Sequence, residues 1–371
     1  MSLWCDRYRP KSFKELDYNV KQADQLQRMV KEGDFPHLLV WGTNGAGKKT
    51  RINCILRELY GSGVDKLRLE RHEYTTPSNK KVEIHACASN YHIEICPADA
   101  GVHDRIVIQE LVKTIAGGQT LNADKQKQFK VIVITEANRL TKDAQHGLRR
   151  TMEKYMSTCR MILLSESTSK LIPALRSRCL GIRVQAPSNE EVKQCLIQAC
   201  ENERFEMSND QLDRIVKLAD RNLRKALLLG EVCKVKGITN GNPPPYDWEE
   251  FLEKTGKMIL ANQSPSQILA VRTNLYELIV RLIPAHIIFQ VDSLSPFVTP
   301  KNPQKLFLQL QRSCPDIQMK TKLAKAAAEF EHRCNLGSKP IYHLEAFVAR
   351  FMADYKSFMD EFIDDMDEDE F

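Results

Sequence analysis

The chain lacks the features of a membrane-spanning or exported protein. None of its apolar runs reaches the about 18 residues that a membrane-spanning helix needs, and its first residues show no charged-then-apolar signal pattern. Its eleven cysteines include no C-x-x-C pair. We therefore expect no membrane partner, no metal site and no disulfide framework, but reduced thiols in an intracellular protein.

Charge is distributed unevenly along the 371 residues. The formal net charge is +6, but the last twelve residues carry eight acids and no base, so the rest of the chain carries +14. A basic body favours a polyanionic partner such as nucleic acid, and the acidic end is expected to be a disordered, solvated tail. The 42% hydrophobic content is enough for two or three domains with real cores.

The first half of the chain alternates apolar runs of strand type with helical patterns, which predicts a parallel sheet covered by helices. A boundary is expected near Ser188, which can cap a helix whose first turn holds Glu190 and Glu191. The Asn- and Pro-rich stretch that follows the next helical segment reads as a linker. The predicted strands are Leu38–Trp41, His92–Ile95, Val131–Thr135 and Arg160–Leu164.

A phosphate-binding loop lies between the first of these strands and a helical segment. Glycines let backbone N–H groups close around phosphates, and the helix N-terminus adds its positive dipole end. Lys48 can reach the β- and γ-phosphates. The predicted nucleotide-binding loop consists of Gly42, Thr43, Asn44, Gly45, Ala46, Gly47, Lys48, Lys49 and Thr50.

The positions that normally bind Mg²⁺ in such a site are altered. The residue after Lys48 should be Ser or Thr, but it is Lys49, which has no acceptor for a cation, and Thr50 comes one residue too late. The later strand should end in an acidic pair, but Thr135 replaces the metal-ordering acid, and only the water-polarising Glu136 is present. We expect the chain to hold a nucleotide, with Mg²⁺ weak or absent, and to hydrolyse it poorly.

The segment 142–155 has the pattern of an amphipathic helix with Thr141 as its N-cap. Its apolar residues fall on one face, and Lys142, Arg149, Arg150 and Lys154 lie away from it. The basic residues could form an ordinary solvated face or bind DNA phosphates; for Arg149, Arg150 and Lys154 we keep DNA binding as a candidate role.

Four stretches carry a specific resemblance to a known family. In this order and at this spacing they resemble the small subunits of replication factor C, the eukaryotic sliding-clamp loader, which are AAA+ ATPases. Residues 45–50, 135–136, 275–279 and 337–347 are most similar to the subunit 3 branch of that family (subunit 5 in fungal naming). The stretches are Trp4–Pro10, Asp143–Glu153, Ser177–Cys179 and Asn222–Leu227.

The resemblance implies an α/β P-loop AAA+ domain followed by a small helical lid domain and an all-α collar domain. It implies a subunit of a heteropentamer in the nucleus that uses ATP to open a ring-shaped sliding clamp and load it on primer–template DNA in replication and repair. The expected bounds are 1–186 for the AAA+ domain, 187–238 for the lid, 239–246 for a linker, 247–359 for the collar and 360–371 for the acidic tail.

Roles carried over by position follow from the same resemblance. Tyr8, Arg9 and Pro10 would lie near the adenine of bound ADP or ATP, and Arg224 would face the γ-phosphate. Arg178 would serve as an arginine finger in a neighbouring subunit's site, since a fixed guanidinium charge neutralises transition-state phosphate oxygens. Glu166 stands where the family usually has a polar sensor, which again weakens hydrolysis in this chain's own site.

Two other readings remain open from the residues alone. A self-sufficient P-loop DNA-dependent ATPase, such as a helicase or remodeller, would need Ser or Thr after Lys48 and an acid at position 135. A scaffold that ignores nucleotide would not need the intact glycines and Lys48. We expect a chain that is part of an ATPase complex and is non-catalytic at its own site.

Overall fold

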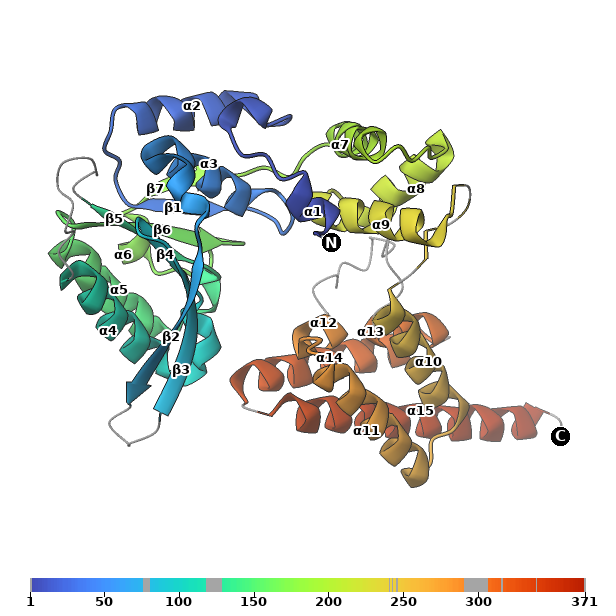
Figure 1. Ribbon diagram of the computed structural model, residues 1–371. Coiled ribbons are helices and arrows are strands. Elements are labelled where there is room, and N and C mark those ends of the chain that lie inside the picture. Colours follow the sequence, from blue (N-terminus) through green and yellow to red (C-terminus); the bar gives the residue numbers. More distant parts are fainter. Residues whose placement is uncertain are drawn as a thin grey trace. The chain divides into compact units, whose positions relative to one another are not determined.

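The computed structural model describes residues 2–75, 81–117, 129–239, 241, 243–244, 246–289, 306–314, 316–337 and 339–369. The chain forms two compact units, Met1–Pro243 and Pro244–Phe371, which are considered separately (Figure 1). Parts of the expected linker and of the expected tail lie outside the described residues. All eleven cysteines are described, and none of them is paired in a disulfide.

Unit 1 contains a sheet whose strands follow the order β2-β3-β4-β5-β6-β1-β7 among the described residues. Strands β4, β5, β6, β1 and β7 run parallel, with Leu38 beside Ile162 in the centre of the sheet. The strands are β1 (Leu38–Trp41), β2 (Arg68–Thr75), β3 (Lys81–Ala88), β4 (His92–Ile95), β5 (Lys130–Ile134), β6 (Cys159–Ser165) and β7 (Leu180–Arg183).

The sheet is mixed, so the expectation of a parallel sheet was wrong at one edge. Strands β2 and β3 pair antiparallel with each other, and β3 pairs antiparallel with β4. The side chains of β2 alternate between exposed and half-buried, so this edge strand has no continuous apolar run that marks a buried strand. The four predicted strands agree with β1, β4, β5 and β6 to within one residue at each end.

Helices cover both faces of the sheet (Figure 1). Helices α2 and α3 pack on one face, where Leu26 and Ile55 join Leu38 and Val133 in one apolar cluster. Helices α4 and α5 contribute to a second cluster. The helices of this α/β part are α1 (Trp4–Arg7), α2 (Val20–Lys31), α3 (Lys48–Tyr60), α4 (Asp104–Gly117), α5 (Lys142–Lys154) and α6 (Pro173–Arg176), with short 3-10 turns η1 (Phe13–Glu15), η2 (Gly61–Asp65), η3 (Pro97–His103) and η4 (Ala137–Arg139).

Three helices complete unit 1: α7 (Asn189–Asn202), α8 (Asn209–Ala219) and α9 (Leu223–Lys236). Helix α7 begins at the predicted cap, because the Ser188 side chain accepts from the backbone N–H of Glu191, whose carboxylate accepts from the backbone N–H of Ser188. The Asn222 side chain caps α9 by accepting from the N–H of Lys225. These caps fix where α7 and α9 begin, and the Asn222 cap lies beside Gly45 of the phosphate-binding loop.

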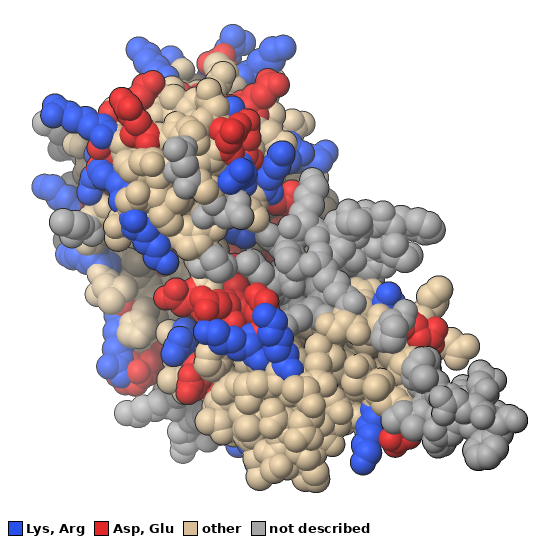
Figure 2. Space-filling view, turned by 90° about the vertical axis from the view of Figure 1, so that its right-hand side faces the viewer, with Lys and Arg blue, Asp and Glu red and all other residues tan. Residues whose placement is uncertain are grey.

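Unit 2 is helical throughout its described residues. Its core joins all six helices, and the rings of Phe289 and Phe347 meet edge to face with centroids 5.2 Å apart. The helices are α10 (Asp247–Ala261), α11 (Pro265–Val280), α12 (Ala285–Phe289), α13 (Leu306–Ser313), α14 (Ile317–Leu336) and α15 (Pro340–Asp369). Residues 258–271, around the α10–α11 connection, include no charged side chain. In the lower part of the view in Figure 2, an extended area of the surface carries no Lys, Arg, Asp or Glu.

Helix α15 includes most of the segment that was expected to be a disordered tail, so that expectation was wrong for residues 360–369. Helix propagation adds one backbone hydrogen bond for each residue fixed, so a helix anchored by buried Leu344, Phe347 and Phe351 can extend into a polar end. Within the described residues, every helix is too short or too polar to cross a lipid bilayer.

Candidate nucleotide-binding site

The phosphate-binding loop connects β1 to α3, as the sequence predicts. Gly45 and Gly47 have positive φ angles of 71° and 77°, a conformation that residues with a Cβ rarely adopt. A Cβ on Gly45 would lie 1.8 Å from Oδ1 of Asn222, and a Cβ on Gly47 would lie 2.2 Å from the Tyr18 hydroxyl. The loop therefore needs glycine at both positions, for its backbone shape and for its close packing.

A buried arginine supports this loop from below. Arg51, on α3, is 1% exposed. Its guanidinium donates to the carbonyls of Ala46, Gly47 and Tyr18, at 3.4, 3.5 and 3.0 Å. It lies over the Tyr18 ring, 4.7 Å from the centroid, and the Tyr18 hydroxyl donates to Ala46 as well. Arg51 and Tyr18 thus fix the end of the loop that leads into the helix.

The loop lysine donates to its own loop. The Lys48 ammonium lies 2.5 Å from the carbonyl oxygen of Gly42 and 3.0 Å from that of Thr43. Burial lowers the pKa of Lys48, while the Glu166 carboxylate raises it and Arg224 lowers it. Lys48 thus lies between the loop, Glu166 and the lid helix α9, where a phosphate group would meet it.

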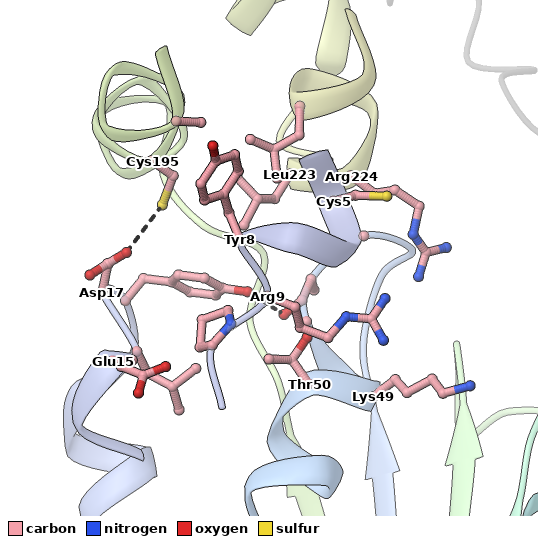
Figure 3. A pocket seen from close by; sticks show the side chains of 18 of the residues that line it. Cys5, Tyr8, Arg9, Glu15, Asp17, Lys49, Thr50, Cys195, Leu223 and Arg224 are labelled. Atoms are coloured by element: carbon pink, nitrogen blue, oxygen red, sulfur yellow. Dashed lines mark hydrogen bonds between the residues drawn. The ribbon is translucent and has the colours of Figure 1, made fainter. Parts of the chain in front are cut away.

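A cavity of about 520 Å³ opens beside the loop, between the N-terminal segment and helices α7 and α9 (Figure 3). Its volume is within the range of ordinary small-molecule sites. Of the predicted nucleotide-binding residues, it is lined by Tyr8, Arg9, Pro10, Asn44, Gly45, Ala46, Gly47, Lys48, Lys49, Thr50 and Arg224. Gly42 and Thr43 are not among its lining residues, but their carbonyls hold Lys48.

One end of the cavity is rich in cations. In Figure 3 the side chains of Arg9, Lys49 and Arg224 extend toward the same side, above and beside the start of α3. The Arg9 guanidinium also contacts Asp6, at 2.8 Å. Together with Lys48 and the helix N-terminus, these groups favour an anionic ligand at this end.

The opposite end carries polar groups that suit a nucleobase. Glu15, Asp17 and Cys195 lie there (Figure 3), and Gln198 and Asn202 also line the cavity. The Cys195 thiol donates to the Asp17 carboxylate at 3.8 Å (Figure 3), and burial raises the pKa of Cys195 to about 12. A thiol with that pKa stays protonated and unreactive, so it serves as a weak donor.

A cluster of charges joins the N-terminal segment to the lid. Glu203 accepts from the Tyr8 hydroxyl at 2.5 Å and from the Lys234 ammonium at 2.6 Å, and it also pairs with Arg7. The bond to Lys234, followed by that to Tyr8, lowers the pKa of Glu203 to about 2. Trp4 is 2% exposed and packs beside α9. The wall that carries Tyr8 is thus tied to the lid.

The residues at the positions for Mg²⁺ do not fit that ion. The Lys49 ammonium pairs with Glu94 on β4, at 2.5 Å. The Thr135 hydroxyl donates to the carbonyl of Ile95, at 3.0 Å, so this hydroxyl is engaged by the neighbouring strand. A positive ammonium therefore stands where a metal-binding hydroxyl would be needed.

The two other acids predicted near the γ-phosphate also interact with neighbouring side chains. Glu136 has a positive φ of 50°, is exposed, and pairs with Arg139 at 2.6 Å. It is not among the residues that line the cavity. Glu166 accepts from the Asn44 side chain at 2.5 Å, directly beside the loop.

Arg178 lies in the turn between α6 and β7, outside the cavity. Its Nε and Nη2 contact Glu153 Oε1, each at 2.5 Å, and its Nη1 donates to the carbonyl of Ala174 at 2.9 Å. The side chain is 36% exposed. This geometry separates Arg178 from the chain's own nucleotide cavity.

The predicted DNA-contacting residues lie on α5, and two of the three lie away from its buried face. Thr141 caps this helix as predicted, and Ala144, Leu148 and Met152 are buried. Arg150 and Lys154 are exposed, whereas Arg149 is half-buried with its Nε lacking a hydrogen-bond partner.

Several residues of the site were missed from the sequence. Arg51 directly follows the loop motif, but a charged residue there gives no sign of burial. Glu94 lies on β4, the strand beside β5, and this adjacency was the one sequence feature that could have placed Glu94 near the site. Glu203 and Lys234 meet Tyr8 only in the folded chain.

Comparisons with known proteins agree with this geometry. Residues 248–359 match the family model "Replication factor C subunit 3, C-terminal domain", residues 194–235 match "RCF1/5-like, AAA+ ATPase lid domain", and residues 18–188 match "DNA polymerase III, delta subunit". Replication factor C subunit 3 from Homo sapiens and from Bos taurus are each 52% identical to this chain, over 99% of both chains. The chain belongs to the replication factor C subunit 3 family.

Replication factor C subunit 5 from Schizosaccharomyces pombe is 42% identical, over 95% of this chain and 96% of that protein. A solved structure of RuvB from Thermotoga maritima is similar over 72% of this chain and 85% of that chain, at 16% identity and a TM-score of 0.45, a likeness too distant to bear on function. Membership in the replication factor C family makes the chain a clamp-loader subunit. It implies an AAA+ nucleotide-binding domain, a lid, a C-terminal helical domain and association with other loader subunits.

Proposed function

We propose that this clamp-loader subunit binds ADP or ATP without hydrolysing it, supplies Arg178 to the ATP site of a neighbouring subunit, and helps to hold the sliding clamp and primer–template DNA. The proposal rests on one combination of observations. The loop that would hold the phosphates is intact, whereas the side chains at both metal-binding positions are paired with other groups of the chain. Lys49 pairs with Glu94, and Thr135 bonds to Ile95, while the glycine-dependent loop and its cavity are preserved.

Nucleotide binding would use the cation-rich end of the cavity for the phosphates. The loop N–H groups, Lys48, Arg9 and Arg224 supply donors and positive charge there, and Tyr8 and Pro10 would lie along the nucleoside. For hydrolysis, the site lacks the acid that would order Mg²⁺ at position 135 and the hydroxyl that would bind Mg²⁺ at position 49. Glu166 beside the loop adds negative charge where the γ-phosphate oxygens would have to be stabilised.

We expect the isolated chain to retain adenine nucleotide in the presence of a chelator, because Lys49 leaves no place for Mg²⁺. Fluorescent ADP titrations with Mg²⁺ and with EDTA should give dissociation constants within about threefold of each other. Turnover of ATP by the isolated chain should stay far below ~1 s⁻¹, the low end of ordinary enzymes.

The matched variant is Lys49→Thr, which restores the usual hydroxyl. It should make binding depend on Mg²⁺. A wild-type chain that releases its nucleotide in EDTA, or turns over ATP near ~1 s⁻¹, would contradict the proposed site.

The arginine finger is proposed for Arg178 because it lies outside its own cavity, is partly exposed, and stands in the Ser177–Cys179 motif. The fixed charge and planar fork of arginine suit phosphate oxygens in a partner's site. Hydrolysis in the assembled complex would then occur at sites of other subunits, with this chain contributing in trans.

DNA contact is proposed for the exposed side of α5. Arg150 and Lys154 are exposed and point away from the buried face, whereas Arg149 is half-buried and would reach a phosphate through the outer part of its guanidinium, since its unpaired Nε is buried. Such residues would bind backbone phosphates without reading bases. The uncharged residues 258–271 of unit 2 suit contact with another loader subunit, since charged residues are depleted at interface cores.

Replacing Arg149 and Arg150 together with alanine should weaken DNA binding by the assembled complex. The slope of log affinity against log salt should fall by about one for each side chain that contacts a phosphate. Lys217→Ala, an exposed lysine on α8, is the matched control and should leave the slope unchanged. An unchanged slope for the double variant would reassign both arginines to a structural face.

The proposal includes a nuclear location, because the similar proteins from mammals and fission yeast belong to organisms whose chromosomes lie in the nucleus. It also includes the domain bounds 1–186, 187–238 and 247–359 for the AAA+, lid and collar domains, with a linker between the last two. The helicase or remodeller alternative lacks support, because the metal-binding positions it needs are occupied by Lys49 and Thr135.

A further inference from the structure

The guanidinium of Arg178 is ordered by contacts within its own chain. Nε and Nη2 share Glu153, and Nη1 donates to Ala174 and lies 3.4 Å from the Ser177 hydroxyl. Of the five guanidinium N–H donors, at least one on Nη2 is left for an acceptor on another molecule. The side chain is thus fixed in direction while one donor edge stays available.

Glu153 is a firm support for this arrangement because its helix is anchored at both ends. At the start of α5, the backbone N–H and the hydroxyl of Thr141 donate to buried Asp104 at 2.7 and 2.9 Å. Near its end, Leu148 and Met152 are 0% and 1% exposed. A carboxylate on such a helix can hold a partner in a defined place, which a carboxylate on a loose loop cannot do.

The turn that carries Arg178 is tied to the same helix. Gln145, on α5, is 1% exposed; its amide donates to the carbonyl of Lys170 at 3.1 Å and accepts from the N–H of Ile172 at 2.9 Å. The backbone N–H of Arg178 donates to Leu175 at 3.1 Å. Glu153 and Arg178 therefore sit on two segments whose separation is set independently of their ion pair.

We propose that Glu153 is a positioning residue for Arg178: it holds the guanidinium ready for the neighbouring subunit's nucleotide. The inference rests on the proposed role of Arg178 in trans. An exposed ion pair adds little to stability, so the pair cannot serve as a strong lock. What it can do is limit the rotamers of a long side chain, and misplacement of a catalytic group by about 1 Å can cost about 100-fold in rate.

The position of Glu153 also joins two proposed surfaces. It lies three residues after Arg150 and directly before Lys154 on α5, so DNA phosphates bound to those side chains would hold the helix that positions the finger. DNA contact and finger placement thus involve one rigid element of this chain.

The test compares ATP turnover of the assembled complex, with clamp and DNA present, for the Glu153→Ala, Glu153→Asp, Arg178→Ala and doubly substituted subunits. The difference between wild type and Arg178→Ala defines the Arg178-dependent turnover. Glu153→Ala should reduce that part about tenfold through kcat, with KM unchanged, and Glu153→Asp should restore part of it. In the Arg178→Ala background, Glu153→Ala should have no further effect.

Asp213→Asn, which breaks the comparable exposed pair Lys193–Asp213 in the lid, is the matched control and should leave turnover unchanged. Size-exclusion chromatography and melting temperature establish that each complex is assembled and folded. If Arg178→Ala lowers turnover but Glu153→Ala leaves it unchanged or raises it, the positioning role is overturned while the proposed function stands. An Arg178→Ala complex with wild-type turnover overturns both.

Discussion

Replacing Arg178 with alanine should reduce ATP hydrolysis at one neighbouring site of the assembled loader by ~10³–10⁵-fold, the usual worth of an arginine finger supplied in trans. The chain's own folding and nucleotide binding should be unaffected, because Arg178 lies outside its cavity and on the surface. Total turnover should fall only in part, since other sites use other fingers. The measurement is a steady-state ATPase assay with DNA and clamp.

The informative comparison is Lys48→Ala in the same assay. This change removes the donor to Gly42 and Thr43 and should weaken nucleotide retention in this chain. Total turnover should remain near that of wild type, because the site is not expected to hydrolyse. Loss of all turnover with Lys48→Ala, together with full turnover for Arg178→Ala, would reverse the two roles.

Replacing Arg51 with alanine should lower the free energy of unfolding by roughly 3 kcal/mol, since it leaves buried carbonyls without donors and opens a cavity under the loop. The carbonyls are those of Ala46, Gly47 and Tyr18. Nucleotide affinity should fall as well, because the loop loses the contacts that fix its shape. Urea unfolding of the isolated chain and ADP titration measure the two effects.

Arg57→Ala is the matched control for this prediction. Arg57 lies on the same helix, α3, but its partner Asp65 is half exposed, and the pair spans the helix end. Such a pair contributes at most about 1 kcal/mol. Equal stability losses for the two variants would show that Arg51 has no special structural role.

The sequence was informative where structure is set locally. The loop glycines, the strand before them and the Thr141 and Ser188 caps each follow from neighbouring residues, and the structure contains all of them. Strand β7 escaped prediction because only Ile182 of its four residues is buried. The antiparallel β2–β3 pair escaped because its polar alternation resembles a solvated surface.

The site was harder to predict where it depends on distant residues. Glu203 meets Tyr8 across 195 positions of the sequence, and Lys49 meets Glu94 across 45. A pairing of that kind leaves no periodic signal in one sequence, because either side chain could equally face solvent. The burial of Arg51 was hidden for the same reason: its acceptors are backbone carbonyls, which every residue carries.

The tie between the N-terminal segment and the lid has a consequence for how the protein is made. The cavity wall at Tyr8 depends on Glu203 and Lys234, which a ribosome adds 155 and 186 residues after Lys48. At ~5–20 residues per second, the phosphate-binding loop is exposed for about 10–40 s before its lid exists. A nascent chain should therefore acquire nucleotide only after α9 has emerged, and a chain stalled before Glu203 should bind none.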